Sequence, residues 1–199
     1  MAASTVVRGK VKQYEMLVIG TSLGGLNALQ TILSGIPETF SLPIVIVQHR
    51  HKTSDHVLAS ALQRKSALQI SDADDKEKIV PGRVYLAPAD YHLMVAGGRF
   101  VLSVDDVVHF SRPSIDVLFE SAADAYDDRV IGLILTGANR DGASGLRKIK
   151  ENGGVALVQD PETAEAPAMP RAAIEETNVD RILPLSKVAP YIVRRYGRK

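Results

Sequence analysis

The sequence predicts an α/β protein: a doubly wound, mostly parallel sheet with helices on both faces and a small β-hairpin region. Short, continuous apolar runs typical of buried parallel strands alternate with segments whose apolar residues recur at helical spacing. The 199 residues, 45% hydrophobic and 24% charged, suit one compact domain. We expect that domain over residues 14–199, preceded by a polar tail or linker remnant over residues 1–13.

The first predicted element is a strand at residues 17–19, followed by a turn flanked by glycines. The turn opens a helix with apolar residues at Leu26, Leu29 and Ile32, which ends before Pro37. A strand, a sharp turn and a helix in this order place the turn at one edge of the sheet, beside a helix N-terminus.

The next predicted pair is a strand at residues 44–47 and a helix over residues 54–63, with Ser54 and Asp55 as candidate N-caps. An acidic stretch at residues 72–78, interleaved with lysines, then predicts a solvated loop and turn.

The middle of the chain contains short strand candidates at residues 84–86, 92–95 and 99–104. The glycine pair 97–98 between the last two predicts a hairpin at one edge of the sheet. The remaining elements alternate again: a helix at 114–126, a strand at 130–135, a helix from 141 to about 152, a strand at 155–158, a helix at 171–176, a strand at 181–183 and a last helix from 186.

Three polar side chains follow predicted strands and indicate nucleophilic catalysis. Ser22 lies within Gly20–Gly24, whose sequence G-T-S-L-G fits the G-x-S-x-G pattern of a nucleophile elbow. His49 follows the second strand, and Asp141 lies beyond the strand at 130–135. The carboxyl ends of parallel strands lie at one edge of a sheet, where these groups would be close together. A serine needs an imidazole to remove its proton, and the imidazole needs a carboxylate to orient it and stabilise its cation.

Each of these residues also has an interpretation without catalysis. The turn at Ser22 equally suits a phosphate-binding turn or a plain strand–helix connection. His49 alone is typical of a surface or satisfied core histidine, and Asp141 of a helix N-cap in a glycine-rich turn. The order serine, histidine, acid differs from that of α/β-hydrolases, in which the acid precedes the histidine. His92 and His109 have no assigned chemistry.

Two other chemistries fit the sequence less well. A dinucleotide site of Rossmann type needs G-x-G-x-x-G, but Ser22 replaces the middle glycine, and Gln48 ends the second strand where an acidic residue is needed. A dinuclear metal site would use His49, His51, Asp55 and His56. Their spacing departs by two residues from the H-x-H-x-D-H cluster of dinuclear zinc hydrolases, so we expect no metal and no cofactor.

Composition excludes several further classes. A net charge of +1 gives no global attraction for nucleic acid. The absence of cysteine excludes disulfides, thiolate metal sites and a cysteine nucleophile, and it suits a reducing compartment. No apolar run approaches the roughly 18 residues that cross a membrane, and the N-terminus has no signal-peptide core. We therefore expect a cytoplasmic protein that does not insert into membranes.

Six motifs, in order along the chain, carry a resemblance to a known family. They are I-G-T-S-L-G-G (19–25), V-Q-H (47–49), P-G-R-V-Y-L-A-P-A-D-Y-H-L (81–93), R-P-S-I-D-V-L-F (112–119), I-L-T-G-A-N-R-D-G-A-S-G (134–145) and M-P-R-A-A-I (169–174). Together they resemble the catalytic domain of the chemotaxis-receptor protein-glutamate methylesterases, the CheB-type family. The resemblance extends from about residue 14 to the last helix.

This resemblance implies a doubly wound α/β fold and a serine carboxylic-ester hydrolase. Its substrates would be γ-glutamyl methyl esters on the cytoplasmic helices of methyl-accepting chemoreceptors, its product methanol, and many members also deamidate receptor glutamines. It implies Ser22 as nucleophile, His49 as general base and Asp141 as orienting acid. The expected oxyanion and substrate loop consists of Thr21, Leu23, Gly24 and Ala138.

Departures from the family pattern adjoin the expected triad. Leu23 replaces a threonine, Arg50 a methionine and Ala138 another methionine. Two alternatives therefore stay open: a related hydrolase with a substrate outside chemotaxis, and a non-catalytic signalling module of the same fold. Typical members also carry an N-terminal receiver domain, but only about a dozen residues precede the first strand here. We expect residues 14–199 to be an excised or stand-alone catalytic domain without a phosphorylation switch.

Overall fold

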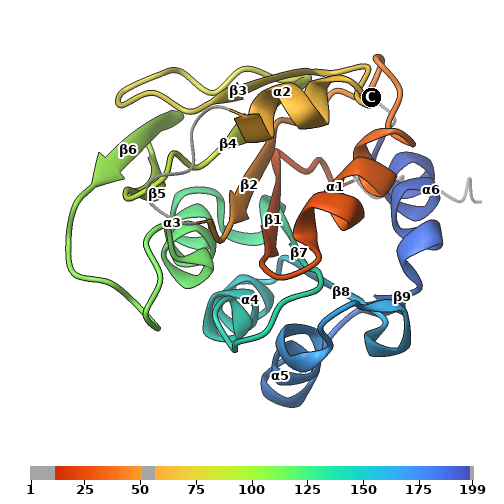
Figure 1. Cartoon of the computed structure of the whole chain (residues 1–199). Helices are drawn as coiled ribbons and strands as arrows, with labels where there is room; N and C mark the ends of the chain where they lie inside the picture. Colours follow the sequence, from red (N-terminus) through yellow and green to blue (C-terminus); the bar gives the residue numbers. More distant parts are fainter. Residues whose placement is uncertain (1–11, 51–56, 198–199) are drawn as a thin grey trace, which may run out of the picture.

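The computed structural model, which describes residues 12–50 and 57–197, has a seven-stranded parallel sheet in the order β3-β4-β2-β1-β7-β8-β9 (Figure 1). Its strands are β1 (Met16–Thr21), β2 (Ile44–Gln48), β3 (Gln69–Asp72), β4 (Arg83–Leu86), β7 (Val130–Ile134), β8 (Val155–Gln159) and β9 (Arg181–Leu183). Strands β5 (His92–Ala96) and β6 (Arg99–Ser103) pair separately as an antiparallel hairpin. The predicted fold class, including the small hairpin region, is confirmed.

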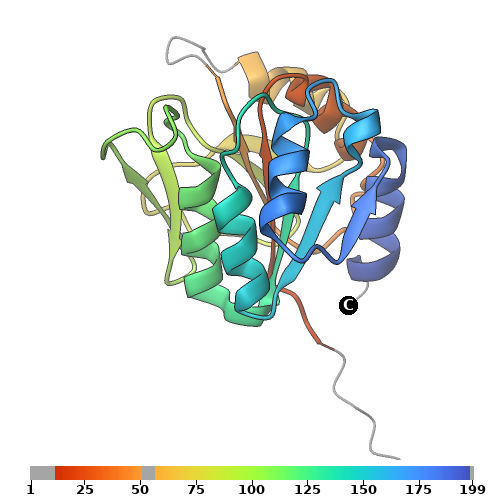
Figure 2. The same ribbon diagram turned by 90° about the horizontal axis from the view of Figure 1, so that it is seen from below.

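Helices cover both faces of the sheet, as Figure 2 shows from below. One face carries α1 (Gly25–Leu33), α2 (Val57–Gln63) and α6 (Leu185–Tyr196), and the other carries α3 (Ile115–Tyr126), α4 (Ala143–Glu151) and α5 (Ala168–Glu176). Two short 3₁₀ turns, η1 (Asp127–Arg129) and η2 (Pro161–Thr163), complete the described elements.

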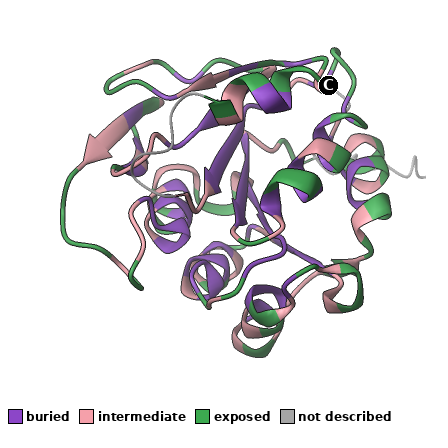
Figure 3. Ribbon diagram, in the orientation of Figure 1, coloured by how far each residue is buried: buried purple, intermediate pink, exposed green. Residues whose placement is uncertain are grey.

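Alternation along β1 explains why this strand is apolar at consecutive positions. Met16 and Val18 pack into the core under α3, α4 and α5, whereas Leu17 and Ile19 pack into the core under α1 and α6. All four side chains are fully buried, and each contributes roughly 1.5–3 kcal/mol to folding. A strand buried on both faces cannot alternate with polar residues, which is why its sequence reads as a continuous run (Figure 3).

The strand order reverses at β1, and this reversal creates the place for a site. The chain passes from β1 to β2 on one side, whereas β7 pairs with β1 on the other side. In open α/β sheets, ligands bind at the crevice beyond the carboxyl ends of the strands at such a point. The segments that directly follow β1 and β7, and residues 49–50 after β2, therefore converge there.

Gly20, near the end of β1, permits a close approach of α3. A Cβ atom at this position would lie 2.3 Å from Cγ2 of Ile115, the first residue of α3. No side chain fits in that space without displacing the helix. The glycine therefore lets the N-terminus of α3 pack directly against the end of β1.

Several predicted details are wrong. β3 was not predicted, because only Ile70 of its four residues is a buried apolar side chain. Asp72 is not part of a solvated loop: it ends β3, is half-buried and accepts a hydrogen bond from Arg50. The segment at 84–86 belongs to the main sheet as β4 rather than to the hairpin region.

Other boundaries differ by a few residues or fall outside the described part. Helix α5 begins at Ala168, three positions before the predicted start, and α4 begins at Ala143 with Gly142 as its N-cap residue. The candidate caps Ser54 and Asp55 lie outside the described residues, as does the predicted tail up to residue 11.

Candidate active site

Ser22 lies in a tight turn between β1 and α1. Its N–H donates to the carbonyl of Thr136 after β7 (2.9 Å), and its own carbonyl accepts from the N–H of Gly25 (2.9 Å). Gly24 closes the turn with φ +79°, a left-handed conformation that strains any residue with a Cβ. These restraints hold the half-buried Ser22 side chain above the end of the sheet.

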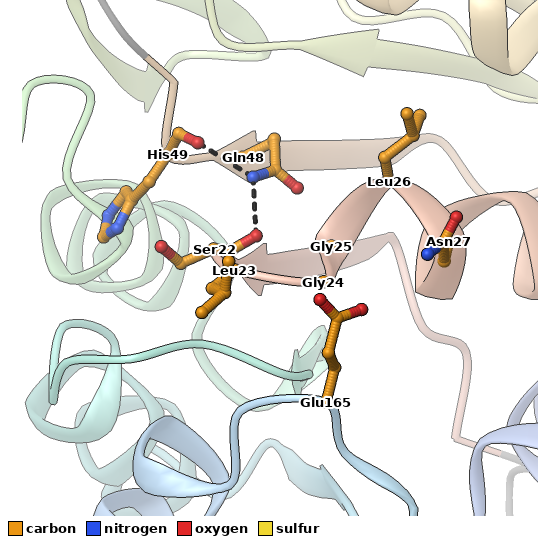
Figure 4. Close-up of a pocket in the computed structure, with 9 residues that line it drawn as sticks. All are labelled: Ser22, Leu23, Gly24, Gly25, Leu26, Asn27, Gln48, His49 and Glu165. Atoms are coloured by element: carbon orange, nitrogen blue, oxygen red, sulfur yellow. Dashed lines mark hydrogen bonds between the residues drawn. The ribbon is translucent and has the colours of Figure 1, made fainter.

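His49 follows β2 directly, and its neighbour fixes it to the serine turn. The N–H of His49 donates to the carbonyl of Thr21 (3.0 Å). The side-chain amide of Gln48 donates to the carbonyls of both Ser22 (2.9 Å) and His49 (2.8 Å), as Figure 4 shows. One amide therefore couples the position of the serine to that of the histidine.

His49 and Asp141 form a close, buried pair. Nε2 of His49 lies 2.7 Å from Oδ2 of Asp141, and the side chains are 12% and 0% exposed respectively. Because Nε2 faces the carboxylate, Nδ1 is the ring nitrogen left for the serine. Figure 4 shows the Ser22 side chain extending toward the His49 ring. The structure thus brings the three predicted residues to one edge of the sheet.

Asp141 also occupies the N-terminus of α3. Its carboxylate accepts hydrogen bonds from Oγ of Ser114 (2.9 Å) and from the N–H groups of Ile115 (2.7 Å) and Asp116 (3.1 Å). Burial raises the pKa of Asp141, but the hydrogen bonds from His49, Ile115 and Asp116 outweigh burial and hold the pKa below its usual value. An ionised Asp141 accepts a hydrogen bond from Nε2–H of His49 and so favours the tautomer with a free Nδ1.

A second buried carboxylate, Asp116, caps α4 in return. Its Oδ1 accepts from the N–H groups of Gly142 (3.0 Å) and Gly145 (2.7 Å). Burial raises the pKa of Asp116 to about 6; the Gly145 hydrogen bond opposes this rise and the nearby Asp141 charge adds to it. The two helices therefore cap each other: Asp141, just before α4, caps the N-terminus of α3, and Asp116 of α3 caps the N-terminus of α4.

The Ser22 turn opens into a pocket of about 500 Å³, which His49 and Glu165 also line. Of the expected oxyanion and substrate loop, Leu23 and Gly24 line this pocket. Thr21 is buried, and its hydroxyl donates to the carbonyl of Thr136 (2.8 Å), which restrains the turn from below. Ala138 is exposed on the loop after β7.

Sequence reasoning missed the residues that support Asp141. Ser114 was predicted as a helix start, not as a partner of the acid. His92, left without chemistry, is buried and accepts from the N–H of Ser114 through Nδ1 (3.2 Å), while its Nε2 lies 3.0 Å from the carbonyl oxygen of Asp106. The only signal for Ser114 was its N-cap position, and nothing local distinguishes His92.

Three of the four residues of the alternative metal site lie outside the described part of the chain. Within residues 12–50 and 57–197, no group of three or more His, Cys, Asp or Glu side chains could hold a metal ion. His51, Asp55 and His56 lie outside those ranges. Among residues 12–50 and 57–197, no helix is long and apolar enough to cross a bilayer.

The comparison that decides the family is a family model described as CheB methylesterase, which matches residues 17–192. The chain belongs to the CheB methylesterase family. Its geometry agrees with a solved member, the crystal structure of the Thermotoga maritima CheB methylesterase catalytic domain. That match has a TM-score of 0.87 at 36% identity and covers 92% of this chain and 98% of that chain.

Curated relatives of this CheB-family chain include short and long proteins. A relative from Leptospira interrogans is 53% identical over 182 residues, which are 91% of this chain and 94% of that protein. A Carboxydothermus hydrogenoformans protein named protein-glutamate methylesterase/protein-glutamine glutaminase 1 is 41% identical over 89% of this chain. The chain spans 54% of that longer relative.

Proposed function

We propose that the chain is a protein-glutamate methylesterase that hydrolyses γ-glutamyl methyl esters on the cytoplasmic helices of methyl-accepting chemoreceptors and releases methanol. The observation that carries the proposal is the buried His49–Asp141 pair, 2.7 Å apart, beside a serine turn in a CheB-family chain. In this proposal residues 14–199 are the catalytic domain, and it works in the cytoplasm.

In the proposed mechanism, Ser22 is the nucleophile, His49 the general base and Asp141 the orienting acid. Nδ1 of His49 removes the Ser22 proton as Oγ attacks the ester carbonyl, and the ionised Asp141 stabilises the resulting imidazolium. The imidazolium then protonates the departing methoxide, which leaves as methanol. A water molecule, deprotonated by the same nitrogen, cleaves the acyl-serine and yields the glutamate carboxylate. The mechanism uses no metal and no cofactor.

The negative oxygen formed in each step needs N–H donors close to Ser22. Leu23 and Gly24 line the pocket beside the serine, and Ala138 lies on the neighbouring loop. We assign the oxyanion and substrate loop to these three residues. Thr21 supports them through its hydrogen bond to Thr136.

Glutamine deamidation is the second candidate activity. The names of the relatives pair the two activities, and the same attack on a side-chain amide releases ammonia instead of methanol. The alternatives of a substrate outside chemotaxis and of a non-catalytic binding module predict no methanol from methylated receptors.

The deciding experiment measures methanol released from methylated receptor membranes by the wild type and by Ser22→Ala. We expect Ser22→Ala to fold normally and to lose turnover by at least about 10⁴, because the nucleophile has no substitute. Ser34→Ala, an exposed serine at the other end of α1, is the matched control and should retain full activity. A folded Ser22→Ala protein with wild-type turnover would exclude the proposed mechanism.

A further inference from the structure

A second pocket adjoins the one at Ser22. It has a volume of about 450 Å³, shares Leu26, Gln48 and His49 with the first pocket, and continues past Arg50 toward α2. Its remaining described lining is apolar, including Val57. Arg50 is the single Lys or Arg side chain among the described residues that line either pocket.

Arg50 is buried with hydrogen-bonding capacity to spare. Its side chain is 8% exposed, and Nη2 donates to Oδ1 of Asp72 (3.0 Å) and to the carbonyl of Ala87 (2.7 Å). Nε and Nη1 are buried and have no hydrogen-bond partner among the described residues. Buried, unpartnered N–H groups are costly, about 1–3 kcal/mol each, and uncommon in folded proteins. Because Nε and Nη1 are shielded from solvent here, an acceptor supplied by a ligand reaches them when the guanidinium turns toward the second pocket, which Arg50 lines.

A carboxylate is the acceptor that suits Arg50 best. Guanidinium N–H groups form short, charge-assisted hydrogen bonds to carboxylates, and these are stronger where apolar walls exclude water. The first pocket has the opposite character, because Glu165 lines it. Figure 4 shows the Glu165 carboxylate pointing toward Gly24, beside the serine turn. A carboxylate is therefore repelled from the Ser22 pocket, whereas a neutral ester is not.

We propose that Arg50 forms a carboxylate subsite beside the catalytic pocket. Through this subsite the enzyme selects a glutamyl methyl ester that has a free Glu or Asp carboxylate close to it on the same helix. This inference rests on the proposed esterase function. It adds that one side chain of the substrate enters uncharged at Ser22 while a neighbouring side chain binds Arg50 as an anion.

The test uses synthetic helical peptides with one γ-glutamyl methyl ester. A single glutamate is moved through each position from four residues before to four residues after the ester, and each peptide has a twin with glutamine at that position. We expect one or two positions at which glutamate raises kcat/KM over glutamine by about tenfold, the size expected for a charge-assisted hydrogen bond. In Arg50→Gln the ratio of kcat/KM for the glutamate peptide to that for its glutamine twin should fall to near one. Arg50→Lys should restore part of this preference.

Arg83→Gln is the matched control. Arg83 also has a buried Nε without a described partner, but it begins β4 at the opposite end of the sheet and lines neither pocket. It should leave the glutamate preference unchanged. If Arg50→Gln does not fold, the wild-type scan still decides, because equal rates for every glutamate and glutamine pair overturn the subsite. If the wild type releases no methanol from any peptide or receptor, the esterase function itself fails.

Discussion

One carboxylate, that of Asp141, joins the chemistry of the site to the packing of the fold. Each of its oxygens accepts two hydrogen bonds: Oδ2 from His49 and Ile115, and Oδ1 from Ser114 and Asp116. A carboxylate at a helix N-terminus is stabilised by the exposed N–H groups and by the helix dipole. The orientation of His49 is therefore as rigid as the start of α3.

Asp141→Asn should lower turnover by about 10² to 10⁴. The amide has one oxygen in place of two, so either His49 or the N-terminus of α3 loses an acceptor, and the charge that stabilises the imidazolium is gone. The free energy of unfolding should also fall by about 1–3 kcal/mol. Methanol release and urea denaturation measure the two effects, with the exposed Asp124→Asn on α3 as control. EDTA should change neither protein, and a silent Asp141→Asn together with inactivation by EDTA would favour a metal site.

The three proposed catalytic residues were predictable because each lies in a segment that follows a strand marked clearly by the sequence. Ser22 and His49 directly follow continuous apolar strands, and the chemistry of a serine site requires a third, acidic group. Arg50 and His92 were not assigned a role, because their partners are 14 or more residues away and only the fold brings them together. The sequence also placed Asp141 at the start of α4, whereas its carboxylate caps α3.

At the scale of elements, the strands that the sequence predicts best are those buried on both faces of the sheet. Strands β1, β2 and β7 are apolar along most of their length because helices cover both sides of them, so their sequences identify them. Edge strand β3 has one buried, one exposed and two half-buried residues, and its sequence resembles a loop. The reciprocal capping of α3 and α4 has no local signal, because each capping carboxylate is distant in sequence from the helix that it caps.

The α3–α4 contact should make stability depend on pH through Asp116. The pKa of this group is about 6 in the folded protein and 3.8 when unperturbed, so between these values the folded state binds a proton that the unfolded state releases. The contribution of Asp116 to the free energy of unfolding is therefore fully present below about pH 4. It falls by roughly 3 kcal/mol as the pH rises toward 6. Asp116→Asn keeps an oxygen for Gly142 and Gly145 without the charge. Its free energy of unfolding, relative to that of the wild type, should therefore rise by about 1–3 kcal/mol from pH 4 to pH 7. Urea denaturation at several pH values measures this, and a constant difference would contradict the raised pKa.

At the scale of the molecule, the sheet reversal, the two pockets and the helix caps all lie along one edge. The rim of that edge is apolar and open, since Leu23 is 57% exposed and Leu26 is 41% exposed beside the serine turn. Apolar side chains at the mouth of a pocket suit contact with the apolar stripe of a substrate helix. Among the described residues, the mouth of the Ser22 pocket is thus open to solvent.

This openness leads to a prediction about regulation. The 199-residue chain should release methanol at a rate that does not change when acetyl phosphate is added, because nothing in the described residues covers the pocket and so nothing needs to be displaced. Initial rates from methylated receptor membranes, with and without acetyl phosphate and Mg²⁺, provide the measurement. Inorganic phosphate at the same ionic strength is the control, since salt alone screens charges such as Glu165 and Arg50. A rate that rises severalfold with acetyl phosphate but not with inorganic phosphate would show that a phosphorylation switch acts on this chain after all.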